Sequence, residues 1–223
     1  MPIEITTLSE LTIDGKLSLG RDASSKGLFN FYGDELRVWF HKQRAQHDAI
    51  MVGAQTVRTD DPELTVRYSE GRNPLRIVTA SSGELPLNAR LLNDGNPTLV
   101  VVSQRASLSA VNALRQKPHV EVIACGDERV DLPGLMTLLR ERGLRTLVAE
   151  GGSRLLHSLF EAQLVSTIII KHLPIISGAL EAPNYLRAEG PLSYLALSRW
   201  RITEWFVVGG VGISIYRTER APS

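Results

Sequence analysis

The chain has 223 residues, 43% of them hydrophobic, so it can bury the core of one large domain, residues 1–223. Its 25 basic and 24 acidic residues leave a net charge of +1, which gives no general attraction to nucleic acid or to an anionic membrane. Cys125 is the only cysteine and no apolar run reaches the length of a membrane span, so we expect a cytoplasmic protein that acts on small molecules.

The amino-terminal part of the chain predicts a strand, a long loop and a helix. Residues 3–13 alternate apolar and polar side chains, as a strand does, before a turn at residues 14–15. Residues 17–34 mix glycine, serine, charged and aromatic residues without a period, which indicates a loop long enough to cover a site. We expect Asp34 to cap a helix that runs to about His47.

The most informative stretch is residues 48–67, DAIMVGAQTVRTDDPELTVR. It opens with an apolar run that predicts a buried strand ending at Gly53, where a phosphate or a flat ring could approach the backbone closely. A single helical turn is expected at residues 56–58, before the acidic residue Asp60. Residues 64–67 are expected to be extended and to present one hydroxyl and one guanidinium. Each feature alone also fits an ordinary strand and turn, but their combination favours a binding site.

Strands and helices alternate through the rest of the chain. This alternation predicts an α/β fold with three layers, α/β/α, around a mostly parallel, doubly wound sheet. A glycine-rich junction near the end predicts a carboxyl-terminal antiparallel hairpin. We expect strands at residues 75–79, 98–102, 120–124, 145–149, 165–173, 200–208 and 213–216, and helices at about residues 108–116, at 132–142 and from 153.

A second candidate site follows the strand expected at residues 145–149. Glu150, Gly151 and Gly152 precede a helix that begins near Ser153, so bare backbone amides at a helix amino terminus could hold an anion there. A glycine pair also serves ordinary turns. The carboxylate of Glu150 favours function, because beside a phosphate it needs a cationic or hydrogen-bonding partner. The five histidines show no metal-ligand spacing, so we expect no metal.

Five motifs of the chain resemble the reductase domain of riboflavin biosynthesis in bacteria and archaea, the family of the RibD C-terminal domain. They are Asp14-Gly15-Lys16, Arg44-Ala45-Gln46, VGAQTVRTDDPELTVR, AEGG and VGGVGISIY. The resemblance extends over nearly the whole chain and implies the dihydrofolate reductase-like fold. It also implies NADPH-dependent reduction of the ribosyl group of an amino- or diamino-ribosylaminopyrimidine 5′-phosphate to a ribityl chain, by a homodimer.

The resemblance implies roles for individual residues as well. Those expected to contact the phosphorylated substrate are Arg44, Leu64, Arg67 and Glu150, and the basic side chain expected to line the same pocket is that of Lys16. Those expected to contact the cofactor are Thr56, Asp60, Ser81, Gly151, Gly152, Ser153, Arg154 and Leu155. From its place at a strand end we expect Glu150 to stabilise charge in the chemical step, with Lys16 as the second catalytic residue. Ser103 and Arg105 also follow a strand, where they could hold the 2′-phosphate of NADPH.

Two features differ from the usual member of the family. Bifunctional members carry a zinc deaminase with paired cysteines, which one cysteine cannot supply, so we expect deamination to come from another protein. Residues 24–32, SSKGLFNFY, replace a shorter segment with serine and threonine, which leaves the substrate open. The alternatives are the riboflavin-pathway reductase, a reductase of the same fold for another heterocyclic or imine substrate, and a nucleotide-binding protein without catalysis. The presence of Lys16, Asp60, Arg67 and Glu150 together argues against the last.

Overall fold

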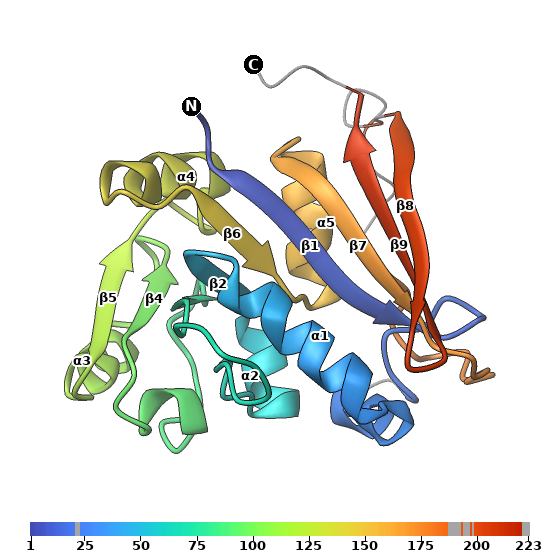
Figure 1. Cartoon of the computed structure of the whole chain (residues 1–223). Helices are drawn as coiled ribbons and strands as arrows, with labels where there is room; N and C mark the ends of the chain where they lie inside the picture. Colours follow the sequence, from blue (N-terminus) through green and yellow to red (C-terminus); the bar gives the residue numbers. More distant parts are fainter. Residues whose placement is uncertain (21–22, 187–192, 194–196, 198, 220–223) are drawn as a thin grey trace.

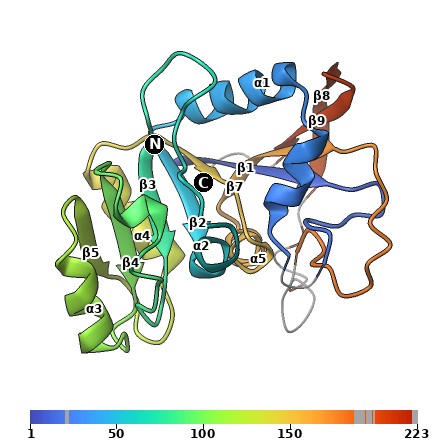
Figure 2. The same cartoon turned by 90° about the horizontal axis from the view of Figure 1, so that it is seen from below.

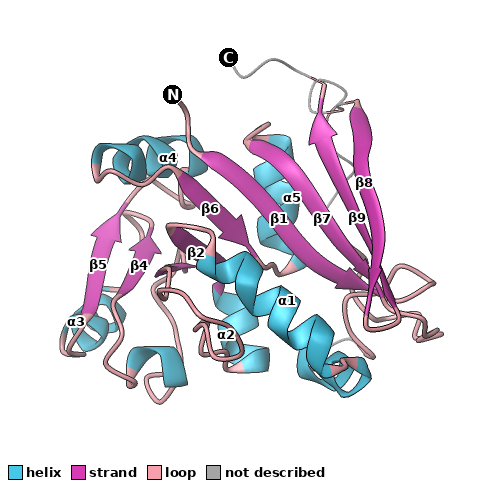
Figure 3. Ribbon diagram, viewed as in Figure 1, coloured by secondary structure: helices cyan, strands magenta, loops and turns pink. Residues whose placement is uncertain are grey.

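The computed structural model describes residues 1–20, 23–186, 193, 197 and 199–219. Its framework is one nine-stranded sheet flanked by helices (Figure 1, Figure 3). The strands are β1 (Glu4–Leu11), β2 (Ala49–Gly53), β3 (Leu75–Thr79), β4 (Thr98–Val102), β5 (Val120–Ala124), β6 (Thr146–Ala149), β7 (Val165–His172), β8 (Trp200–Val208) and β9 (Val211–Thr218). The helices are η1 (Ser25–Phe31), α1 (Asp34–Ala45), α2 (Ala54–Asp60), η2 (Arg90–Leu92), α3 (Leu108–Arg115), α4 (Leu132–Glu141) and α5 (Ser153–Glu161).

The strand order is β5-β4-β3-β2-β6-β1-β7-β9-β8. All pairings from β5 to β7 are parallel, and β9 and β8 complete the sheet in antiparallel fashion. The expected α/β/α fold with a carboxyl-terminal hairpin is therefore confirmed. From β2 the chain moves outward through β3, β4 and β5, and then returns to the other side of β2 as β6. In sheets of this kind ligands bind where the strand order reverses, outside the carboxyl ends of the strands.

The two faces of the sheet carry separate hydrophobic cores. Successive residues of a strand point to opposite faces. Along β2, Ile50 and Val52 join the core under α1, α2 and α3, whereas Ala49 and Met51 join the core under α4 and α5. Figure 2 shows α1 and α5 on opposite faces. Because both faces are covered, the central parallel strands are continuous apolar runs, which is why their positions could be read from the sequence.

Helix α1 brings one charged side chain into the interior. Leu36, Phe40 and Arg44 recur at four-residue intervals and are all buried. This spacing places them on one face of the helix, above the sheet. The first two supply the apolar stripe that packs the helix, and the third carries a guanidinium inward at its last turn. The cap of α1 is Gly33 and Asp34 is the first helical residue, so the expectation that Asp34 caps this helix is wrong.

Two loops differ from their expected form. Helix α2 has seven residues instead of one turn, and the residue that caps its carboxyl end, Asp61, lies in the left-handed region (φ 39°). Leu64 also has a positive φ (56°) and is 2% exposed, so the chain bends at this buried residue, and the segment 64–67 is not extended at its first residue as expected. In the long loop, the fully buried side chain of Leu28 anchors the short helix η1. No helix in the described ranges is long and apolar enough to cross a membrane.

Candidate active site

Two helices, each preceded by a glycine, begin side by side at the carboxyl ends of β2 and β6. The amide of Gly53, before α2, donates to the carbonyl of Gly151 at 3.1 Å. A Cβ on Gly152, before α5, would lie 3.2 Å from Thr56 Oγ1, and one on Gly53 would lie 3.7 Å from Leu155 Cβ. Neither helix has a side-chain cap. The first amides of α5 are therefore donors that can meet an anion.

Arg44 and Glu150 form a buried two-point ion pair next to the glycine pair that leads into α5. Arg44 Nε and Nη2 each donate to one oxygen of Glu150 at 2.7 Å, and the two side chains are 7% and 9% exposed. Arg44 Nη1 donates to the carbonyl of Thr65 at 3.0 Å. Glu150 does not cap α5, whose cap is Gly152 without a side-chain bond. Arg44 therefore fixes the carboxylate of Glu150, and the expected contact of Arg44 with the phosphorylated substrate stays a prediction.

A second buried ion pair, which we did not expect from the sequence, lies against the ring of Phe40, as Arg44 also does. Register places Glu10 of β1 beside Lys171 of β7, and Lys171 Nζ lies 2.6 Å from Glu10 Oε2. Lys171 is fully buried, donates to the hydroxyl of Tyr32 and lies 3.8 Å from the ring centre of Phe40. Arg44 Cζ lies 4.4 Å from the same ring centre. Burial, with the charge of Glu10, raises the pKa of Tyr32 well above its usual value. The only signal in the sequence is a lysine in an apolar strand.

His41 is a neutral acceptor beneath the bend that follows α2. Its Nδ1 accepts the backbone N–H of Arg67 at 3.0 Å, and its ring meets that of Tyr68 edge to face at 4.8 Å. Burial, together with the positive charges of Arg44, Arg67 and Lys171, lowers the pKa of His41 to about 3. The imidazole therefore stays uncharged near neutral pH, with its proton on Nε2, and fixes the main chain at Arg67.

The expected substrate contacts Leu64 and Arg67 lie in this bend, next to the buried pair. Arg67 Nη1 donates to Thr65 Oγ1 at 2.6 Å and forms an ion pair with Glu63. The same carboxylate of Glu63 also pairs with Arg90. The guanidinium of Arg67 remains 44% exposed, so it can reach a ligand, whereas Leu64 contributes a buried apolar side chain.

Lys16 follows β1, the neighbour of β6, at the same edge of the sheet. Its backbone N–H donates to Thr12 Oγ1 at 2.9 Å, and its Nζ donates to Asn184 Oδ1 at 2.8 Å. Asp14 in the same turn accepts from Thr12 Oγ1 and from the amide of Ser177, and these bonds lower its pKa to about 2. The turn is thus tied to the chain after β7, and a catalytic role for Lys16 stays a prediction.

Asp60 connects α2 to the segment that differs from the family pattern. Its two oxygens accept the amide and the hydroxyl of Ser25 at 3.1 and 2.9 Å. Lys26 Nζ donates to the carbonyl of Asp61 at 3.2 Å. The start of η1 therefore packs directly onto Asp60 and Asp61. Contact between Asp60 and the cofactor stays a prediction, and in the structure its carboxylate positions η1.

Three further candidate cofactor contacts gather at the carboxyl ends of β3 and β4. Ser103 is 2% exposed, and its hydroxyl donates to the carbonyl of Ser81 at 2.9 Å. Ser81 Oγ accepts the amide of Val130 at 3.1 Å. Arg105 pairs with Glu128 at 2.9 Å on the open surface, with 73% of its side chain exposed. The two serines therefore hold the loops together, and Arg105 has the exposure that binding a phosphate requires.

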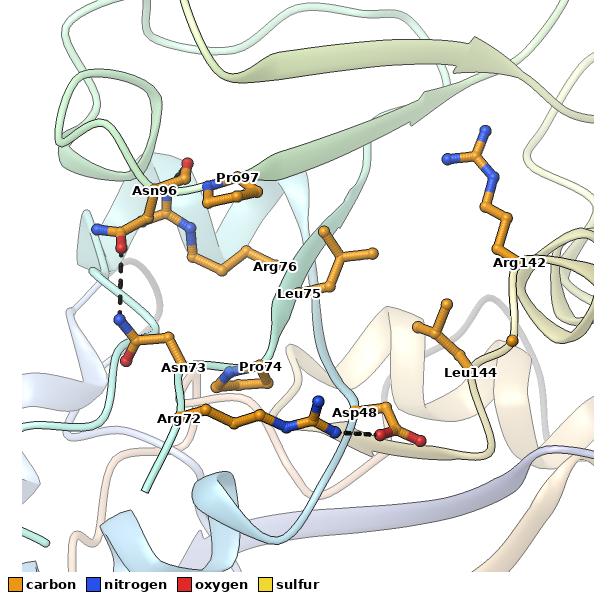
Figure 4. A pocket seen from close by; sticks show the side chains of 11 residues that line it. Asp48, Arg72, Asn73, Pro74, Leu75, Arg76, Asn96, Pro97, Arg142 and Leu144 are labelled. Atoms are coloured by element: carbon orange, nitrogen blue, oxygen red, sulfur yellow. Dashed lines mark hydrogen bonds and ion pairs between the residues drawn. The ribbon is translucent and has the colours of Figure 1, made fainter. Parts of the chain in front are cut away.

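A hollow of about 420 Å³ lies at the opposite edge of the sheet, among the amino ends of the strands (Figure 4). Its three arginines are already paired: Arg72 with Asp48 at 2.5 Å, Arg76 with Asp94 at 2.6 Å, and Arg142 with Glu121 at 2.7 Å. Because ligands of doubly wound sheets bind at the carboxyl ends, we do not assign the active site here. The residues that line this hollow are Asp48, Arg72, Asn73, Pro74, Leu75, Arg76, Asn96, Pro97, Arg142, Gly143 and Leu144.

The fold and these contacts define a doubly wound α/β protein with open backbone donors and a buried ion pair where the strand order reverses. No group of three or more His, Cys, Asp and Glu side chains that could hold a metal ion occurs in the described part of the chain. The RibD C-terminal domain family matches residues 4–211, and the chain belongs to that family. The resemblance found in the sequence is thereby confirmed.

Individual relatives agree with this assignment. The chain is 38% identical over 206 residues to the 2,5-diamino-6-ribosylamino-4(3H)-pyrimidinone 5′-phosphate reductase of Aquifex aeolicus, covering 92% of each chain. It is 39% identical over 208 residues to the reductase of the same name from Archaeoglobus fulgidus, covering 88% of this chain and 92% of that one. A pyrimidine reductase-like protein from Corynebacterium diphtheriae superimposes with a TM-score of 0.81 at 20% identity, covering 99% and 93% of the two chains. This last likeness shows the fold.

Proposed function

We propose that this protein is an NADPH-dependent reductase that converts the ribosyl group of 2,5-diamino-6-ribosylamino-4(3H)-pyrimidinone 5′-phosphate to a ribityl chain. The observation that carries this proposal is the 38% identity to the Aquifex aeolicus reductase along 92% of both chains. The geometry supports it, because the buried pair of Arg44 and Glu150 lies directly before the glycine pair at the uncapped amino terminus of α5.

The glycine pair fits the phosphates of a dinucleotide. A Cβ added to Gly151, which has a φ of 103°, would meet nothing within 4 Å, so the space beside it is open. The amides at the start of α5 would hold the negative charge, and Thr56, beside Gly152, would border the bound phosphates. Arg105 is the exposed cation that would meet the 2′-phosphate. When bound, NADPH supplies the hydride for the reduction.

The chain's own residues position the substrate and balance its charge. The C1′ carbon of the open-chain imine gains a hydride and its nitrogen gains a proton, so one NADPH and one proton are consumed per turnover. Glu150 is held in place by Arg44, and each carboxylate oxygen keeps a lone pair that can accept an N–H of the substrate. This preorganised acceptor favours the cationic, protonated imine over the neutral one.

The proposal is tested by adding purified protein to the diaminopyrimidine substrate with NADPH and following the loss of reduced-nicotinamide absorbance. We expect a product heavier by two hydrogens, and weaker turnover with NADH. The 5-amino substrate and dihydrofolate serve as comparison substrates. If folded protein binds NADPH but reduces neither pyrimidine, the proposal is wrong; turnover of another heterocycle or imine alone would assign the second function considered from the sequence.

We further propose that the protein is a homodimer joined through β8. This strand ends the described sheet, so one edge of its backbone faces no other described strand. Three of its apolar side chains are more than half exposed: Ile202 at 52%, Trp205 at 59% and Val207 at 65%. An exposed edge strand with apolar side chains associates readily, and a second copy would bury both features.

A further inference from the structure

One carboxylate, that of Glu63, is shared by two half-exposed guanidiniums. Its Oε2 pairs with Arg67 Nη1, and its Oε1 lies 2.5 Å from Arg90 Nη2. The side chain of Glu63 is 22% exposed, against 44% for Arg67 and 53% for Arg90. The three side chains thus carry two positive charges and one negative charge, with both guanidiniums more exposed than the carboxylate between them.

The backbones of all three residues are fixed, so the cluster is a built arrangement. The amide of Arg90 donates to Asp61 Oδ1 at 2.8 Å, and the amide of Arg67 donates to His41 Nδ1 at 3.0 Å. The carbonyl of Glu63 accepts from the buried guanidinium of Arg76 at 3.0 Å. The two guanidiniums are thereby held near each other even if the carboxylate of Glu63 turns away.

The cluster continues the row of charges that begins at Glu150 and Arg44. Glu150 pairs with Arg44, whose Nη1 donates to the carbonyl of Thr65 at 3.0 Å. The hydroxyl of that same Thr65 accepts from Arg67 at 2.6 Å. A substrate whose reacting carbon lies near Glu150 can therefore extend outward along Thr65, with its far end toward Arg67.

We propose that Arg67 and Arg90 together bind the phosphate of the substrate, and that Glu63 occupies their donors until the phosphate displaces it. This inference rests on the proposed function. A phosphate monoester carries close to two negative charges and three acceptor oxygens, whereas a carboxylate carries one charge and two oxygens. Two guanidiniums therefore favour the phosphate, and Glu63 sets a threshold that an uncharged or singly charged ligand does not pass.

The test measures the binding of inorganic phosphate to the whole protein by calorimetry, which requires no turnover. Arg90→Gln should weaken binding about tenfold or more, the range for a hydrogen bond between charged groups. Glu63→Gln should tighten it about two- to fivefold, because a surface ion pair that competes is lost. Arg72→Gln is the matched control: it removes one exposed arginine at the opposite edge and should change binding less than about twofold.

Turnover provides the second measurement. With the phosphorylated substrate, Arg90→Gln should raise KM about tenfold and leave kcat unchanged, and with the dephosphorylated substrate it should have no effect. The inference is overturned if Arg90→Gln matches Arg72→Gln in phosphate binding, or if Glu63→Gln weakens that binding. If phosphate binding changes as expected but no pyrimidine is reduced, the phosphate site stands and the proposed function fails.

Discussion

Replacing Glu150 by glutamine separates the structural from the chemical contribution of the buried ion pair. The amide oxygen of glutamine can still accept one N–H of Arg44. Its amide nitrogen, however, turns a donor toward the second N–H that Arg44 directs at this side chain. With both side chains less than a tenth exposed, Arg44 would remain as a buried charge without a counter-ion. Breaking such a pair from one side costs about 3 to 5 kcal/mol of the free energy of unfolding. We also expect hydride transfer to slow about a hundredfold, or roughly 2.7 kcal/mol, because the acceptor for the cationic imine is neutralised.

The control is the double variant Arg44→Met with Glu150→Met, which removes both charges and fills similar space. Its free energy of unfolding should fall by less than that of Arg44→Met or Glu150→Met alone, because the double variant leaves no buried charge without a partner. Its hydride-transfer rate should stay as low as that of Glu150→Gln. Urea unfolding gives the stabilities, and single-turnover absorbance at saturating NADPH gives the rates. Wild-type transfer by the double variant would show that the pair only supports the fold, which would refute a chemical role for Glu150.

Four other predictions follow from features of the same molecule. Lys171→Met should lower the free energy of unfolding, measured in urea, by about 3 to 5 kcal/mol, because Glu10 loses its buried partner. The double variant Lys171→Met with Glu10→Gln should regain part of this stability, and an equal loss in the single and the double variant would contradict the prediction. The pKa of His41 is about 3 when folded and 6.5 in the free side chain, so the unfolded chain binds the proton first. The free energy of unfolding should therefore fall as pH drops from 6.5 toward 3, by at most about 1.4 kcal/mol per pH unit. An NMR titration that shows His41 of the folded protein gaining its proton near pH 6 would refute this prediction. Arg105→Ala should weaken NADPH binding by about 1.5 to 3 kcal/mol in fluorescence titrations and leave NADH unchanged, whereas equal weakening of both would point to misfolding. Val207→Glu should convert a dimer to a monomer in light scattering, and a monomeric wild-type protein would remove the proposed interface.

The strands of the parallel sheet could be located from the sequence because each is a short apolar run between polar or glycine-rich segments. The limits expected for β3, β4 and β5 agree with the structure at every residue. The same holds for the start of α5 after the glycine pair, where the absence of a side chain lets two helices approach. These features are local, and local sequence patterns therefore describe them well.

The pairings within the site could not be predicted, because they depend on strand register and on contacts distant in the chain. Glu10 and Lys171 meet only because β1 and β7 align in one particular register. The positive φ of Leu64 follows from burial of its side chain, which outweighs the extended preference of its neighbours. Arg44 was recognised as a site residue, but its partner Glu150 lies 106 residues further along the chain.

The position of β1 determines when this protein can fold during synthesis. β1 leaves the ribosome before the other eight described strands and lies in the sheet interior, and both its neighbours, β6 and β7, come after residue 145. Pairing across such sequence separations is slow, because the intervening chain must be closed before any contact forms. β1 therefore waits with both edges unpaired until β6 and β7 have emerged. A nascent chain that stops before Val165 already contains the residues of α1 and the glycine pair. Without β7, however, it leaves one edge of β1 open to pairing with other chains.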